Sequence, residues 1–232
     1  MVRIKSKKFY WSSSRVNSAN YCGMRYYLKY MLGKEELRLS AYVKGSFLHS
    51  LIENFWDRLG TPEEVAKKSS SKKYFDAKSF VDYARRKWQR IIIADEEADQ
   101  HIAWTYDNEK WIIRGNLGPI CSPLFDYLSK EGRPLFAELP FDFKIDGERF
   151  TGRIDEVRII DKQIVLTDYK SGKPWVGEMK LDFDPQLTLY NAGLCSLILF
   201  NPNIARVLGL EGRIEEFMHG NRFTSPEILE RF

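Results

Sequence analysis

Closely spaced cysteines and long apolar runs are both missing from this chain of 232 residues. Its three cysteines, Cys22, Cys121 and Cys195, are too widely scattered for a disulfide framework or for a zinc site, which needs close ligand pairs. No run approaches the roughly 20 apolar residues of a membrane span, and no apolar segment follows the basic N-terminus as it would in a signal peptide. We therefore expect a cytoplasmic protein with reduced thiols and no membrane partner.

A strong excess of either charge is also missing. The chain has 36 lysines and arginines against 32 aspartates and glutamates, a formal net charge of +4. This balance is compatible with nucleic-acid binding but too small to indicate it, so any such surface must be a local patch. The length, and the ordinary hydrophobic content of 44%, predict one globular domain over residues 1–232 with a sizeable core.

The most informative stretch runs from Thr151 to Gly172. Runs rich in Ile, Val and Leu lie on both sides of Asp161 and Lys162, which predicts an antiparallel hairpin with its tight turn at these two residues. Stepping outward from that turn sets Asp155 opposite Asp168. The hairpin is therefore predicted to be apolar near the turn and to carry two facing carboxylates beyond it.

Like charges directly opposite each other destabilise a strand pair by up to roughly 1 kcal/mol. A divalent metal held between Asp155 and Asp168 would offset the repulsion, with Lys170 farther along the same face, near whatever the metal binds. The alternative is an exposed hairpin end on which Lys170 and Arg153 simply neutralise the acids. Spacing alone does not decide between the two.

Asp155, followed after a short apolar strand by Asp168-Tyr169-Lys170, resembles the active-site signature of the PD-(D/E)XK nuclease superfamily. The stretches GRIDEV and TDYKSGK are most similar to the branch that contains RecB-type helicase-nucleases and CRISPR-associated Cas-four exonucleases. The resemblance covers about residues 12–211. It implies a restriction-endonuclease-like fold of the α/β class, in which a mixed β-sheet is flanked by helices and carries a helical insertion.

We place the helical N-terminal and insertion region at about 12–131 and the sheet core at about 135–219. Periodicity and caps predict helices at 12–32 (interrupted near Cys22), 41–59, 75–97, 104–130 and 185–200. The helix at 75–97 is predicted to bury Phe80, Ala84, Trp88 and Ile91 or Ile92, and the helix at 185–200 to bury Cys195. The helix at 104–130 is predicted to form around Trp111, Ile112, Leu117, Leu124, Phe125 and Leu128. Strands are predicted from about 135, through a turn at Asp146-Gly147 and the central hairpin, then at 205–211 and in the run 213–220.

The first helical segment is rich in aromatics, including Tyr26, Tyr27 and Tyr30. They either pack the segment against the domain or line a nucleic-acid path, and packing is the favoured interpretation. In the similar family a cysteine near this place joins three others in an iron–sulfur cluster. Cys22 lies at the comparable position, but partner cysteines are missing, and a cluster normally takes four thiolates. We therefore predict no iron–sulfur cluster and a colourless protein.

The resemblance also implies a metal site. His49, in the pattern Gly-x-x-x-His, would join Asp155, Asp168 and the backbone carbonyl of Tyr169 in holding Mg²⁺ or Mn²⁺. The metal would polarise the scissile phosphate and lower the pKa of its bound water. Glu138 falls in the first predicted strand, as a supporting group rather than a ligand.

Three further residues have roles by resemblance. Lys170 would orient the water or stabilise the developing charge. Gln186 and Tyr190, four apart on one helix face, match a Gln-x-x-x-Tyr pattern and would order the site or the substrate strand.

The implied function is a metal-dependent DNA nuclease, more specifically an exonuclease, that acts on single strands or duplex ends in DNA repair, recombination or CRISPR adaptation. A helicase or recombination and adaptation proteins are the implied partners. Two other functions stay open: a DNA-binding or recombination scaffold without turnover, and an enzyme acting on a small phosphorylated substrate.

Overall fold

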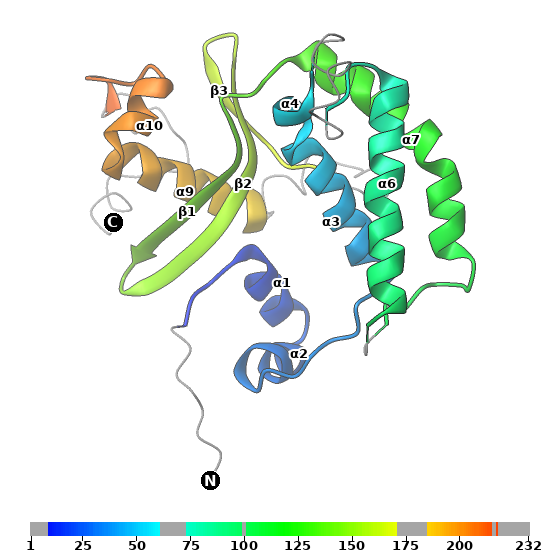
Figure 1. Ribbon diagram of the computed structural model, residues 1–232. Coiled ribbons are helices and arrows are strands. Elements are labelled where there is room, and N and C mark those ends of the chain that lie inside the picture. Colours follow the sequence, from blue (N-terminus) through cyan, green and yellow to red (C-terminus); the bar gives the residue numbers. More distant parts are fainter. Residues whose placement is uncertain (1–8, 61–72, 99–100, 171–184, 215–216, 218–232) are drawn as a thin grey trace. The chain divides into compact units, whose positions relative to one another are not determined.

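The structure is a computed structural model that describes residues 9–60, 73–98, 101–170, 185–214 and 217 (Figure 1). The chain forms two compact units. The first, here the sheet unit, contains the described residues of 1–35, 134–168 and 174–232. The second, the helical unit, contains those of 36–133 and 169–173. Each unit is described by itself below.

The sheet unit is built on three antiparallel strands in the order β1-β2-β3: β1 (Phe136–Ile145), β2 (Glu148–Ile160) and β3 (Gln163–Thr167). Both predicted turns are present, and all four of their residues have positive φ, from 50° to 82°. Two-residue hairpin turns of type I′ require such φ values at both positions, and Asp and Gly tolerate them. The turns Asp146-Gly147 and Asp161-Lys162 therefore fix the register on both sides of β2.

The register of the second hairpin is as predicted, with Ile160 opposite Gln163 and Glu156 opposite Thr167. The ladder ends at that pair, one step before Asp155 and Asp168. At the apolar end near the turn, Ile159 and Ile160 are exposed. The hairpin thus projects at its turn and is buried around Asp155.

The predicted mixed sheet is wrong for the part of the chain that the structure describes, since every pair of named strands is antiparallel. The predicted strand at 205–211 is also wrong, because Pro202–Val207 forms helix α10. The Asn201 side chain caps this helix and Pro202 occupies its first turn, two start signals that outweigh the apolar composition. The run 213–220 lies mostly outside the described residues, but Ile214 and Phe217 are helical rather than extended.

Helix α9 (Pro185–Phe200), predicted as such, packs on β1 and β2 (Figure 1). Its buried side chains join Leu139, Phe141 and Ile154 in the core of the sheet unit. The helix comes close at Gly193, where a Cβ atom would lie 2.5 Å from the Phe141 ring. A glycine is required there for this close approach.

The N-terminal segment of the sheet unit comprises α1 (Ser13–Tyr21), α2 (Gly23–Tyr26) and a π-helical turn, η1 (Tyr27–Met31). Ser12 caps α1, and the predicted interruption falls at Cys22. Just before α1, the backbone of Trp11 bonds to β2: its N–H donates to Arg149 at 2.7 Å, and its carbonyl accepts from Thr151 at 2.8 Å. This single bridge to Phe150 is parallel.

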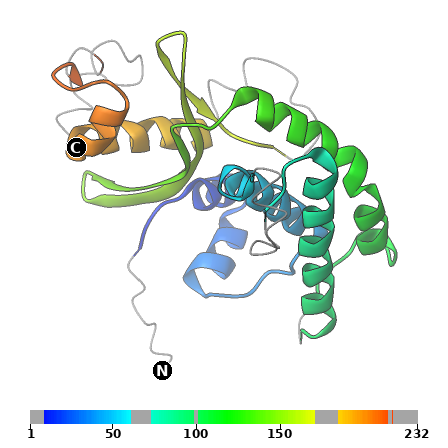
Figure 2. The same ribbon diagram turned by 45° about the horizontal axis from the view of Figure 1, so that its top comes forward.

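The helical unit contains α3 (Ser40–Glu53), α4 (Phe55–Arg58), α6 (Ala77–Glu96) and α7 (Glu109–Glu131), close to the predicted helices. Figures 1 and 2 show α6 and α7 side by side. The predicted stripe of α6, including Phe80, Ala84, Trp88 and Ile92, is fully buried. Phe55, also fully buried, touches four other aromatic rings, so the core of this unit is rich in aromatic contacts.

Helix α7 departs from prediction in the residues that it buries. Trp111 and Ile112, predicted among its apolar contacts, are exposed. The buried stripe instead runs through Glu109, Leu117, Cys121 and Leu128, at spacings of three to four residues and their multiples. Trp111 and Ile112 lie six and five residues before Leu117 and so fall off this stripe.

No helix among the described residues is long and apolar enough to cross a membrane.

Candidate metal centre

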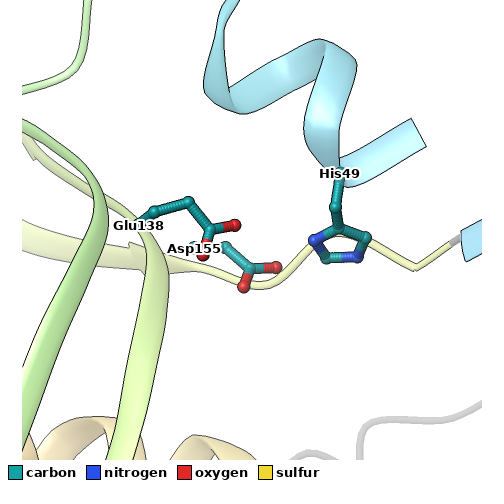
Figure 3. Close-up of side chains that lie close together, drawn as sticks. All are labelled: His49, Glu138 and Asp155. Carbon is teal, nitrogen blue, oxygen red and sulfur yellow. The ribbon is translucent and has the colours of Figure 1, made fainter. Parts of the chain in front are cut away.

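Two carboxylates face each other at the centre of the sheet, Glu138 from β1 and Asp155 from β2. The flanking pairs Ala137–Glu156 and Leu139–Ile154 set this register. A carboxylate oxygen of Glu138 lies within 4.8 Å of one of Asp155, and Figure 3 shows the two groups side by side. Asp155 is buried and Glu138 half-buried, so their repulsion is poorly screened by water.

The backbone at Glu138 is unusual. Its φ is +50°, in the left-handed region, and the β1–β2 ladder omits the pair Glu138–Asp155 while keeping the pairs on both sides. A residue with a Cβ atom pays roughly 1–2 kcal/mol to adopt this conformation. Such local strain in an otherwise regular strand is typical of functional sites, where the surrounding structure holds a side chain in place.

Helix α9 supplies hydrogen bonds to two acids. The Tyr190 hydroxyl donates to Asp155 Oδ1 at 3.1 Å. The Gln186 amide donates to Asp168 Oδ1 at 2.9 Å and to the Tyr190 hydroxyl at 2.7 Å. A chain of hydrogen bonds therefore joins Asp168, Gln186, Tyr190 and Asp155, although the two aspartates are not ladder partners.

In this hydrogen-bond network the Tyr190 hydroxyl is neutral and acts as a donor. Burial, and then the negative charge of Asp155, raises the pKa of its hydroxyl far above the ordinary value. A carboxylate has two oxygens with about four lone-pair positions, so one hydrogen bond orients Asp155 without using up its capacity as a ligand. The network thus orients both acids through neutral donors, and α9 contains no lysine or arginine.

The other predicted site residues belong to the helical unit. His49 lies half-buried on α3, and Figure 3 also labels it. The chain leaves the sheet unit after Asp168, so the Asp-Tyr-Lys motif is divided between the units. Tyr169 packs against the aromatic core of the helical unit, and Lys170 is exposed.

Of the predicted residues, the structure therefore brings together Asp155, Asp168, Gln186 and Tyr190, and adds Glu138. Sequence reasoning treated Glu138 as a supporting group. A signal for its place was available, because the register rule used for the second hairpin, applied outward from Asp146-Gly147, pairs Glu138 with Asp155.

The cysteines are free in the described part of the chain. Cys121 and Cys195 are fully buried, as predicted for Cys195, and burial raises the pKa of their thiols to about 11 and about 12. Cys22 is exposed at the junction of α1 and α2. The absence of an iron–sulfur cluster stays a prediction.

The family model of the PD-(D/E)XK nuclease superfamily matches residues 10–209 of the chain. This span includes His49 and every acid, amide and hydroxyl of the network just described. A search of the curated proteins gives no match.

Proposed function

Since the chain belongs to the PD-(D/E)XK nuclease superfamily, we propose that it is a metal-dependent deoxyribonuclease with its active centre at Glu138 and Asp155. The observation that carries the proposal is the approach of these two carboxylates within 4.8 Å, held by a strained backbone on one side and by Tyr190 on the other. Two facing, poorly screened negative charges favour the binding of a cation between them.

The types of ligand fit a divalent cation. Glu138 and Asp155 offer two carboxylates, and His49 is the proposed imidazole ligand; such a set suits Mn²⁺ and, through its oxygens, Mg²⁺. Asp168 and the carbonyl of Tyr169 are further proposed ligands. When bound, the cation would polarise the scissile phosphate and lower the pKa of a bound water.

The remaining residues have proposed roles that follow from their chemistry. Lys170 would orient the attacking water or stabilise the charge that develops on the phosphate. Gln186 and Tyr190 would hold Asp168 and Asp155 in the ligand geometry, since the two donors are themselves bonded to each other.

We place the chain further in the branch of RecB-type and Cas-four-like exonucleases, on the stretches GRIDEV and TDYKSGK and on the pair Gln186 and Tyr190. In that setting the substrate is a DNA single strand or duplex end. The process is repair, recombination or CRISPR adaptation, with a helicase or an adaptation protein as the partner.

The test uses linear DNA labelled at one end and closed circular DNA, each with Mg²⁺ or Mn²⁺. We expect wild-type protein to shorten the linear DNA and to leave the circle intact. Asp155→Asn and Glu138→Gln should reduce hydrolysis at least roughly a hundredfold, as loss of a group that stabilises charge at a reacting centre does. The matched control is Asp142→Asn, an exposed acid of β1 that pairs with Arg149 and should keep full activity.

Hydrolysis by Asp155→Asn at the wild-type rate would remove the assignment. DNA binding without hydrolysis at any concentration of either cation would identify a scaffold instead. Cleavage of the closed circle would keep the nuclease but overturn the exonuclease.

A further inference from the structure

The segment formed by α2 and η1 turns an apolar stripe toward solvent. Tyr21, at the end of α1 and three residues before Met24, is 82% exposed. The stripe itself has the spacing that normally marks the buried face of a helix, i, i+3, i+4, i+7 and i+8. All of its members are exposed: Met24, Tyr27, Leu28, Met31 and Leu32. We call these five residues and Tyr21 the outer stripe.

The opposite side of the segment fixes it to the sheet unit. Tyr26 stacks on Trp11 with ring centres 5.9 Å apart, and Trp11 is bonded to β2. The Arg15 guanidinium lies 4.0 Å from the ring centre of Tyr10 and 4.8 Å from that of Tyr30. Packing thus accounts for Tyr26 and Tyr30, as the sequence favoured, but not for Tyr27 on the outer stripe.

The charge of this region is one-sided. Residues 1–34 contain eight lysines and arginines and no aspartate or glutamate. Because the whole chain carries only +4, the remainder is net acidic. The basic residues of the described part are Arg15, Arg25, Lys29 and Lys34. Arg15 packs on Tyr10 and Tyr30, so the basic residues proposed for contact with a polyanion are Arg25, Lys29 and the exposed Lys34.

We propose that the outer stripe is an accessory binding surface for single-stranded nucleic acid. Unpaired bases would stack on Tyr21 and Tyr27 and lie against the neighbouring methionines and leucines, while the basic residues of the segment neutralise phosphates. A duplex hides its base faces, so the same surface would not bind a duplex in this way. The inference rests on the proposed function for its choice of substrate, but the surface is built from other residues.

The test measures binding of the full chain to a fluorescent oligothymidylate and to a duplex of equal length, in EDTA so that no hydrolysis occurs. Tyr21→Ala/Tyr27→Ala should weaken oligothymidylate binding roughly fivefold or more. Roughly fivefold corresponds to the smallest effect expected for the loss of one stacked base. Duplex binding should change less than about twofold. The matched control is Tyr106→Ala/Tyr127→Ala, which removes two tyrosines of the helical unit that are 50% and 48% exposed, against 49% for Tyr27, and should bind like wild type.

Two further variants separate stacking from charge. Tyr27→Trp keeps a ring and should retain the affinity. Lys34→Gln, at an exposed position, should lower the slope of log affinity against log salt by about 0.7 for one lost phosphate contact. Thermal melting of each variant shows whether it is folded, which the exposure of these side chains leads us to expect.

Wild-type affinity for oligothymidylate in Tyr21→Ala/Tyr27→Ala overturns the inference, and so does an equal loss for duplex. Binding to vesicles of anionic phospholipid that exceeds binding to oligothymidylate, and depends on the same tyrosines, overturns it in favour of a membrane surface. Failure of the proposed function is a separate result: the wild type then hydrolyses no DNA, whatever the tyrosine variants do in EDTA.

Discussion

Two buried acids, one in each unit, differ in the groups that lie beside them. In the helical unit, Glu109 accepts hydrogen bonds from the Lys44 ammonium at 2.7 Å and from the Thr105 backbone at 2.6 Å. In the sheet unit, Asp155 accepts from the neutral hydroxyl of Tyr190 and faces a second acid, Glu138. A buried acid with a cation beside it stabilises a fold, whereas two acids placed together are suited to binding a cation from solution. The surroundings of Glu109 therefore favour a stabilising role, and those of Glu138 and Asp155 favour metal binding.

The largest effect should come from the aromatic core of the helical unit. Phe55→Ala removes a fully buried ring that contacts Trp56, Tyr74, Phe80 and Phe125. We expect it to lower the free energy of unfolding by about 3–5 kcal/mol. Chemical denaturation measures this, with Phe75→Ala as the control because Phe75 is exposed and should cost under about 1 kcal/mol. A small loss for Phe55→Ala would mean that this core is not what stabilises the unit.

A somewhat smaller effect is expected in the core of the sheet unit. A Cβ atom at position 193 would lie 2.5 to 2.8 Å from three atoms of the Phe141 ring, closer than real contacts allow. Gly193→Ala should therefore cost roughly 1–3 kcal/mol by overpacking. The control is Gly115→Ala in α7, where nothing lies within 4 Å and the change should stabilise the helix slightly. Equal effects at the two sites would show that α9 is not packed on Phe141 as described.

Local signals in the sequence were enough for most of the fold. Helix α6 has a clean apolar stripe and a capping box at Asp76, and the hairpin turns contain Asp146, Gly147 and Asp161, which tolerate positive φ. The strand predicted at 205–211 failed because composition was weighed above the cap at Asn201 and the proline after it. The prediction for Trp111 and Ile112 was wrong because α7 is apolar on more than one side.

The site was predictable where it depends on chain-local geometry. Gln186 and Tyr190 share a helix face at a spacing of four, and the hairpin register aligned Asp155 with the end of β3. The left-handed backbone at Glu138 was not predictable, because nothing in a glutamate between alanine and leucine favours positive φ. That conformation depends on the whole sheet. The ligand role proposed for Glu138 depends on the sheet for the same reason.

The buried acid Glu109 of the helical unit should affect how the free energy of unfolding depends on pH. Burial opposes the ionisation of Glu109, but hydrogen bonds from Lys44, Thr105 and Ser40 outweigh it and lower the pKa to about 2. Because the folded pKa lies below the ordinary value of 4.5, the stabilisation is present above pH 4.5 and is lost as the pH falls toward 2.

Glu109→Gln should therefore cost about 2 kcal/mol at pH 7 and have a flatter profile of stability below pH 4.5. Denaturation midpoints between pH 7 and pH 2.5 measure both. Glu96→Gln is the control, since Glu96 pairs with Lys110 at the surface and should change stability by under about 1 kcal/mol. An acid limb that is as steep in Glu109→Gln as in wild type would assign the loss of stability to other groups.

The smallest effect, and the one of opposite sign, is expected at the facing acids of the sheet unit. Glu138→Gln removes one of two neighbouring negative charges and leaves the side-chain shape and the backbone unchanged. Without metal it should raise the free energy of unfolding by up to roughly 1 kcal/mol, the amount by which like charges opposite each other destabilise strands. Adding Mn²⁺ should raise the melting temperature of wild type by mass action and that of Glu138→Gln much less.

The control is Asp142→Asn, which removes the exposed partner of Arg149. This variant should be slightly less stable than wild type in EDTA, and Mn²⁺ should raise its melting temperature as much as that of wild type. If Glu138→Gln is instead destabilised in EDTA and still gains fully from Mn²⁺, then Glu138 is a structural acid like Glu109, and the contrast between these two acids disappears.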